Sequence, residues 1–193
     1  MDREDALKEP GPTWDHPGGK LIELGPLTLR DEELLAILIG SGYKGRTAQA
    51  IAKTLMDKYY SIAGLLRRTS AELSKIKGLK NGKIARIAAS FEITKRIFKE
   101  NNKELMNARL IRLGLPELSD VAVLAVLIGG GYKEKTPEDL SRELLNKFGS
   151  ISGLMGQRLY DMAQIEGLGD VRVARIAAAL EMARRIAKAL EKE

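Results

Sequence analysis

The sequence predicts an all-α protein built as a tandem repeat of two five-helix units. Aligning the chain with itself at an offset of 89 residues pairs 24–99 with 113–188 without a gap, and about 31 of the 76 paired positions are identical. Apolar residues recur at helical spacing in both copies, and no stretch alternates for long enough to predict a strand. Because the copies would bury equivalent faces, we expect a pseudo-two-fold axis to relate them.

The repeat and the local composition divide the chain into four segments. We expect an irregular N-terminal arm at 1–20, a first unit at 21–100, a linker or helix extension at 101–112 and a second unit at 113–193. Proline and glycine are frequent in the arm and interrupt regular structure. Trp14 is a candidate to pin the arm onto the folded body.

Each unit is expected to begin with a short buried helix. In the first copy this helix starts at Asp31, with acidic residues that complement the helix dipole, and ends at Gly40. The second helix starts at Thr47 and, in the later copy, at Thr136, a cap that Pro137 follows at the first helical position. Two short helical pieces and one long helix complete the first unit, at 62–66, 71–76 and 83–101.

Composition limits the class of protein. The 193 residues include 32 Lys and Arg against 26 Asp and Glu, and the net charge of +6 favours a polyanionic partner. The absence of cysteine excludes disulfides, thiolate metal sites and cysteine nucleophiles. Without a signal-like or membrane-length apolar stretch, we expect a cytoplasmic protein with no membrane partner.

A glycine-rich turn near the end of each copy carries the chemistry. In the second copy, residues 165–174 read Ile-Glu-Gly-Leu-Gly-Asp-Val-Arg-Val-Ala, which is the form of a helix-hairpin-helix motif. The glycines permit a tight turn that approaches a ligand closely, and the leucine between them fills the core. Free amides at the start of the following helix make a site for an anion such as a DNA phosphate.

The two hairpins are expected to contact DNA unequally. The first copy has Lys80 where the second has Gly169, and the lysines around it make the first hairpin more basic. We therefore expect side chains to matter more in the first hairpin and backbone amides more in the second. The predicted DNA-binding residues are Gly78, Leu79, Lys80, Gly82, Lys83 and Arg86 in one unit and Gly167, Leu168, Gly169, Val171, Arg172 and Arg175 in the other.

Motifs matching one known family run through both units, including 31–38, 76–79 and 165–169, and cover nearly everything after residue 20. On these residues each unit resembles the N-terminal helix-hairpin-helix domain of RadC-type proteins, a UPF0758-like family labelled as DNA-repair factors. The resemblance implies association with DNA and, as further partners, other repair proteins. Such proteins usually continue into a JAB-like metal domain with a His-x-His pair. Since His16 is the one histidine here, we expect that zinc site to be lacking.

Other motifs favour structural interpretations. Residues 40–47 come within one residue of a P-loop, but they follow a helix instead of a strand, which favours a glycine-rich connection ending in a threonine cap. Glu92 with Arg96, and Glu181 with Arg185, have the four-residue spacing of ion pairs that stabilise a helix. The basic residues of the two glycine-rich connections are candidate outer phosphate contacts: Lys44, Arg46, Lys133 and Lys135.

The sequence therefore predicts a DNA-binding protein that is not an enzyme and that holds phosphates of duplex or branched DNA without reading sequence. We expect no catalytic residue, no metal site and no cofactor. A lyase or hydrolase acting on DNA would need a catalytic carboxylate in a base-sized pocket, and no clear candidate follows the second hairpin. The main alternative is a protein-interaction adaptor whose hairpins are only tight turns. Hairpins on opposite sides of the molecule would be unable to clamp a single duplex.

Overall fold

Helices form the regular structure of the described residues, as the sequence predicts. The computed structural model describes residues 16–100 and 118–190, so Trp14 and the linker expected at 101–112 lie outside it. The elements are α1 (Pro17–Leu24), η1 (Pro26–Thr28), α2 (Asp31–Ile39), α3 (Ala48–Tyr59), α4 (Ile62–Leu66), α5 (Ser70–Ser74), α6 (Asn81–Glu100), α7 (Asp120–Ile128), α8 (Pro137–Phe148), η3 (Ser152–Leu154), α9 (Leu159–Ala163) and α10 (Asp170–Leu190). In these two ranges no helix is both long and apolar enough to cross a membrane.

Local sequence explains where the helices begin and end. The Thr47 hydroxyl accepts a hydrogen bond from a first-turn amide of α3 at 3.1 Å. Thr136 and Asp139 cap α8 reciprocally, each accepting a bond from the other's backbone amide. Gly40 and Gly129, both with positive φ, end α2 and α7. These caps match the sequence prediction.

The N-terminal arm is helical where it is described, so the expectation of an irregular arm up to residue 20 is wrong for 17–20. Pro17 occupies the first turn of α1, and the His16 ring accepts a bond from the Gly19 amide at 3.1 Å. Leu21 is fully buried on the main core. A preorganised helix start and this apolar anchor outweigh the local excess of proline and glycine.

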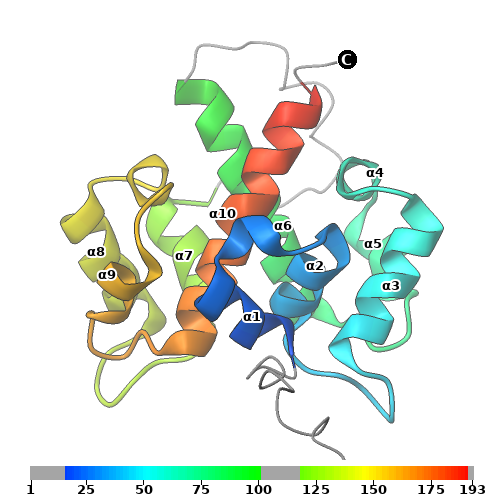
Figure 1. The fold of residues 1–193 in the computed structure, drawn as a ribbon, viewed down its shortest axis with the longest axis horizontal. Helices are drawn as coiled ribbons and strands as arrows, with labels where there is room; N and C mark the ends of the chain where they lie inside the picture. The colour runs from blue at the N-terminus through cyan, green and yellow to red at the C-terminus, as the bar shows by residue number, and fades with distance from the viewer. Residues whose placement is uncertain (1–15, 101–117, 191–193) are drawn as a thin grey trace, which may run out of the picture.

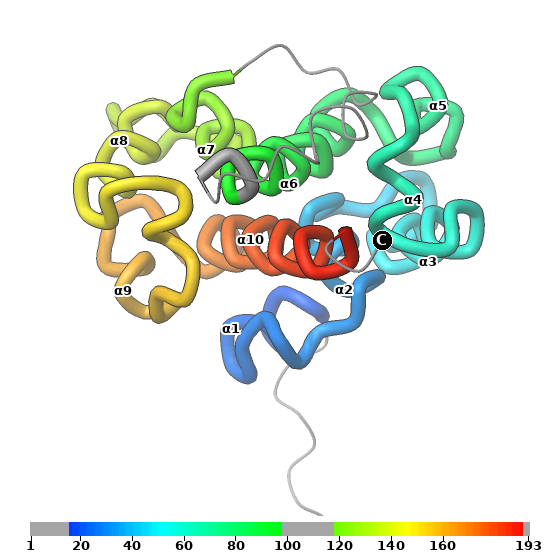
Figure 2. The backbone as a smooth tube through the Cα atoms, turned by 90° about the horizontal axis from the view of Figure 1, so that it is seen from above, coloured from blue at the N-terminus to red at the C-terminus, as the bar shows by residue number. Residues whose placement is uncertain are grey.

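The two units repeat one order of helices around a crossed central pair. The first unit contains α2 to α6, and the second contains α7, α8, η3, α9 and α10, so a 3-10 turn replaces α4 in the second copy. In Figure 1 the outer lobes, α3 to α5 and α8 to α9, flank the long helices α6 and α10. Both long helices rise in Figure 1, and in Figure 2, seen from above, they lie side by side and their projections run in opposite directions, which fits a pseudo-two-fold axis along this view.

The units are interlocked, because each long helix packs on the first helix of the other unit. α6 packs on α7, and α10 packs on α2. Equivalent arginines stabilise this packing between the units: Arg185 donates to Asp31 at 2.7 Å, and Arg96 donates to Asp120 at 2.7 Å. A single apolar core therefore extends through both units.

Two buried carboxylates belong to this central region. Glu92 and Glu181 are buried and pair with the arginines four residues later, at 3.3 Å to Arg96 and 2.6 Å to Arg185. Buried charges of this kind are tolerated only when they are paired and hydrogen-bonded. The structural ion pairs predicted from the spacing are confirmed.

Candidate nucleic-acid interface

Both hairpin turns lie on one side of the molecule, which we call the hairpin edge and define by residues 40–47, 76–83, 129–136 and 165–172. The hairpins lead into the starts of α6 and α10, which lie in the lower half of Figure 1, and both helices rise from there. Seen from above, the two starts lie at opposite ends of the crossed pair. One extended ligand along this edge can therefore reach both units.

The fold itself requires the first glycine of each hairpin. Gly78 and Gly167 have φ of +95° and +103°, a region that other residues rarely adopt. A Cβ at Gly78 would lie 2.8 Å from Ile51 Cδ1, and one at Gly167 would lie 2.9 Å from Tyr132 Cβ. The leucine that follows each glycine is buried, as predicted. These residues shape the turn from inside the core.

The later glycines have no such structural need. A Cβ at Gly82 or Gly169 would meet no atom of the described residues within 4 Å, and neither backbone has a positive φ. Lys80 occupies the position equivalent to Gly169 without a positive φ. The missing side chain at Gly169 therefore affects only what approaches from outside.

The start of each long helix presents amides toward the outside. Gly169 O accepts the first bonds of α10, from the amides of Arg172 and Val173. The amides of Asp170 and Val171 precede these donors and have no acceptor within the helix. The first hairpin repeats the pattern at the start of α6. Such amides carry partial positive charge and bind anions.

Two predicted phosphate contacts, Arg86 and Arg175, are occupied by helix C-termini. Arg86 donates to Leu38 O at 2.6 Å, and Arg175 donates to Leu127 O at 2.8 Å. These carbonyls belong to the last turns of α2 and α7, where helical donors run out. Each arginine therefore caps a helix within its own unit. These bonds do not use all of its guanidinium N–H groups.

Lys83 and Arg172 join the glycine-rich connections to the hairpins. Lys83 Nζ donates to Ser41 O at 2.5 Å, and Arg172 donates to Gly131 O at 2.7 Å as well as to Gly167 O. Their charged groups thus bond to backbone carbonyls of the hairpin edge instead of extending from it. They stabilise the turns that hold the free amides in place.

These inner cations are crowded together. Burial lowers the pKa of Arg86, and burial together with the charges of Arg86 and Arg172 lowers the pKa of Arg175 to about 10. Burial, followed by the charge of Arg86, also lowers the pKa of Lys83. Positive charge is therefore concentrated between the hairpins. A bound anion would reduce the repulsion between these cations.

Outward-facing lysines gather at the first hairpin. Lys44, Lys77 and Lys80 are exposed, and Lys44 and Lys80 lie 5.5 and 5.6 Å from the centre of the Tyr43 ring. Among the described residues no carboxylate pairs with these three lysines, which we call the lysine cluster. Lys77 is one of the lysines from which the sequence predicts a more basic first hairpin, although it is not among the predicted DNA-binding residues.

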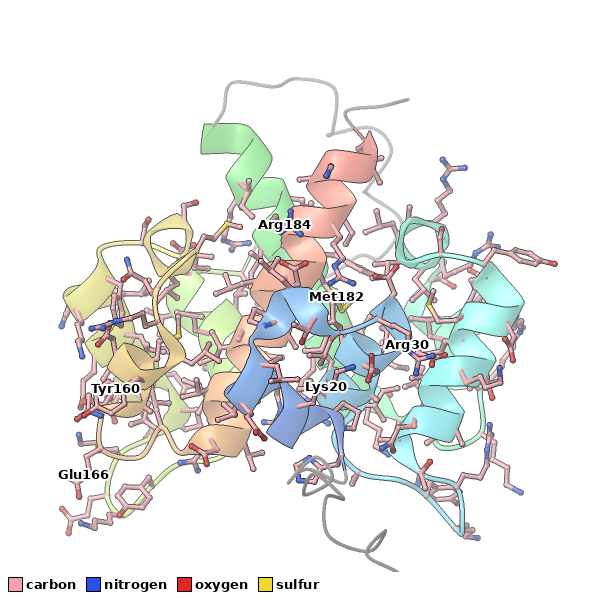
Figure 3. All side chains as sticks on the ribbon, viewed as in Figure 1. Lys20, Arg30, Tyr160, Glu166, Met182 and Arg184 are labelled. Atoms are coloured by element: carbon pink, nitrogen blue, oxygen red, sulfur yellow. The ribbon has the colours of Figure 1, made fainter. Side chains whose placement is uncertain are left out.

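The second hairpin lacks an equivalent cluster. Glu166 takes the position of Lys77 and accepts a bond from Lys133 at 2.6 Å; it is labelled at the outer tip of this lobe in Figure 3. This bond raises the pKa of Lys133 and lowers the pKa of Glu166. Lys135 also pairs with an acid, Glu143, at 2.8 Å. The two hairpins are thus alike in backbone and different in charge.

The P-loop-like stretch is a connection between two helices, as favoured from the sequence. It follows α2, closes a small turn in which Tyr43 and Arg46 exchange backbone bonds of 2.8 and 3.0 Å, and ends at the cap of α3. Arg46 donates to Lys77 O at 3.1 Å. Over residues 16–100 and 118–190, no group of three or more potential metal ligands is present.

Comparisons with known proteins agree with this architecture. A family model described as UPF0758 N-terminal matches twice, at residues 11–85 and 99–174. The chain is 42% identical over 80 residues to a UPF0758 protein of Methylibium petroleiphilum, covering 42% of this chain and 36% of that protein. It is 39% identical over 89 residues to one of Coprothermobacter proteolyticus, covering 46% and 36%. The chain thus spans about a third of the length of these relatives. No solved structure matches.

Proposed function

The chain belongs to the UPF0758 N-terminal family, and we propose that it is a non-sequence-specific DNA-binding protein that contacts phosphates through its two hairpins. One observation carries the proposal: both hairpins open onto the same edge, and the more basic one presents lysines that no acid in the described part of the chain neutralises. Amides and lysines hold phosphates without reading bases, so binding would depend on salt and not on sequence.

The two hairpins would contact phosphates in different ways. The lysine cluster supplies mobile charges at the first hairpin, while the second, with its Lys133 paired to Glu166, relies on the free amides of α10. The carbonyl-bonded arginines and Lys83 would contribute mainly by holding the turns and by their field. We propose no enzymatic activity and, from the resemblance to RadC-type proteins, a role in DNA repair or recombination in the cytoplasm.

A salt titration of DNA binding tests the proposal. Gel shifts with duplex, branched and single-stranded DNA would be measured for wild type and for Lys77→Gln with Lys80→Gln. We expect the double variant to bind about tenfold more weakly, with the slope of log K against log salt reduced by about 1 to 2, since each lost phosphate contact removes about 0.9.

A matched variant controls for net charge. Lys53→Gln with Lys188→Gln also removes two exposed lysines, in α3 and at the far end of α10, and should bind like wild type. Equal weakening by both pairs would mean that only overall charge matters. No binding by wild type at low salt would defeat the proposal and favour the adaptor that uses the same fold without DNA.

A further inference from the structure

A groove of about 580 Å³ lies between the two units at the hairpin edge. Arg86 of the first unit forms part of its lining. The second unit supplies the rest: the start of α10, with Arg172 and Arg175, and the glycine turn that follows α7. The groove thus belongs mostly to the second unit, and Arg86 is the contribution of the first.

The arginines converge on the groove from both units. A Cβ on Gly40 would lie 3.6 Å from Arg86 Nη2 and 3.9 Å from Arg175 Nη2, so the equivalent guanidinium groups flank this one glycine. Asp170 also lines the groove, but no ion pair in the described part of the chain joins it to the arginines. The arginine charges thus meet here without an acidic partner among residues 16–100 and 118–190.

Several hydrogen-bond donors of the groove are unused. Arg175 Nε is buried and has no partner among the described residues, and the bonds that Arg175 makes to the end of α7 use Nη1. Buried donors without a partner are rare and costly, and an unseen ligand is one recognised explanation. The free amides at the start of α10 border the same space.

We propose that this groove binds a phosphate group, held jointly by Arg86 of one unit and Arg172, Arg175 and the α10 amides of the other. Phosphate offers several acceptor oxygens to converging donors, and the planar guanidinium suits it. The volume admits a phosphate that is part of a larger molecule. The site shares the α10 amides with the contact proposed above for the second hairpin and adds arginines of both units, but phosphate binding here does not require that the lysine cluster binds DNA.

Titration with inorganic phosphate, followed by proton–nitrogen NMR, tests the site directly. At constant pH and ionic strength, phosphate should saturably shift the amides of Gly169, Asp170 and Val171 and the Nε–H of Arg175. Chloride at equal ionic strength should leave them unshifted. Phosphate shifts that follow the exposed lysine cluster instead, or that match those from chloride, would count against the site.

Substitutions at the rim give a second test of the site. Asp170→Asn removes the one carboxylate of the groove and restores the amide present at the equivalent Asn81, so phosphate affinity should rise at least threefold. Arg172→Gln should lower it by a similar factor; because Arg172 also donates to Gly131 O and Gly167 O, an unchanged urea midpoint must accompany this loss for it to count as a lost phosphate contact. Asp57→Asn, in α3, makes the same change as the first variant and should have no effect. Unaltered affinity in both rim variants would overturn the assignment.

The same signals identify the source of the phosphate. If a short duplex shifts them and free phosphate does not, the occupant is a phosphodiester of nucleic acid; if free phosphate suffices, a small phosphorylated ligand is accommodated. If neither shifts them, the site does not exist. Phosphate binding that persists in Lys77→Gln with Lys80→Gln, or in a wild type that fails to bind DNA, would separate this inference from the proposed function.

Discussion

Tyr60 and Gly149 occupy the same turn in the two units, but only one of them is a glycine. Tyr60 ends α3 with φ of 66° and is 89% exposed, whereas Gly149 ends α8 with φ of 85°. A side chain in the left-handed region costs about 1–2 kcal/mol, and this one recovers little of that cost by packing. The first unit therefore carries local strain that the second avoids.

Replacing that tyrosine should stabilise the protein. We expect Tyr60→Gly to raise the free energy of unfolding by about 0.5–1 kcal/mol, because relief of strain exceeds the extra entropy of glycine in the unfolded chain. Urea denaturation measures the change. Tyr160→Gly, an identical replacement at a 69% exposed site inside α9, should instead destabilise by about 1 kcal/mol. If both variants lost the same free energy of unfolding, the backbone of Tyr60 would not be strained.

The two glycines of the second hairpin should separate folding from binding. Gly167→Ala forces a Cβ to within about 3 Å of its neighbours at φ of +103°, and we expect it to cost about 2–3 kcal/mol in urea denaturation. Gly169→Ala meets no atom within 4 Å and should cost about 0.5 kcal/mol. It should nevertheless weaken DNA binding severalfold in gel shifts. Unchanged binding would show that no phosphate approaches this backbone closely.

Among the helices, α10 carries a carboxylate that links stability to pH. Burial raises the pKa of Glu181, but bonds from Arg184 and Arg185 at 2.7 and 2.6 Å outweigh it, so this pKa lies below its ordinary value. A carboxyl whose pKa is lower in the folded state stabilises the protein above its unfolded pKa. That contribution is lost as the pH falls through the folded pKa.

Acid titration of stability should reveal this helix contact. Below about pH 4.5, the ordinary pKa of a glutamate, we expect the free energy of unfolding of wild type to fall. Glu181→Gln should be less stable by about 3 kcal/mol at pH 7, because Arg184 loses its carboxylate and Arg185 keeps only Asp31 and Leu29 O, and should lose less on acidification. Exposed Glu134→Gln should follow wild type. Parallel curves for all three proteins would exclude a role for Glu181.

Elements were predictable from the sequence where their causes are local. The caps at Thr47 and Thr136 and the pairs formed by Glu92 and Glu181 depend on residues three or four positions apart, and the structure has them as expected. The start of α1 also has local signals, in Pro17 and the His16 cap, but the surrounding proline and glycine obscured them. Its anchor, Leu21, depends on a core that no local pattern reveals.

The candidate site was harder to predict because its contacts join distant positions. The turn residues Gly78 and Gly167 were identified from their motif, and their geometry follows it. No local pattern indicates that Arg86 caps a carbonyl 48 residues earlier, or that it meets Arg175 between the units. Long polar side chains can serve phosphates or carbonyls equally well, and only the tertiary fold determines which they reach.

At the scale of the whole molecule, the duplicated units form one interlocked body whose two hairpins differ in charge. Because α6 and α10 exchange partners between units, the hairpins are held on one edge by a shared core. Their backbones are equivalent, and charge distinguishes them: Lys77 stands in one hairpin where Glu166 stands in the other. If the edge binds DNA, this difference between Lys77 and Glu166 determines how strongly the second hairpin contributes to binding.

Making the second hairpin resemble the first should strengthen DNA binding. Glu166→Lys raises the net charge by two and frees Lys133 from its 2.6 Å ion pair. We expect about tenfold tighter binding at moderate salt and a slope of log K against log salt steeper by about 1 to 2. Asp57→Lys makes the same charge change and frees Lys53, but it lies in the last turn of α3, toward the end farther from the hairpins. If it tightened binding as much as Glu166→Lys, the gain would come from net charge and the hairpin edge would hold no special position.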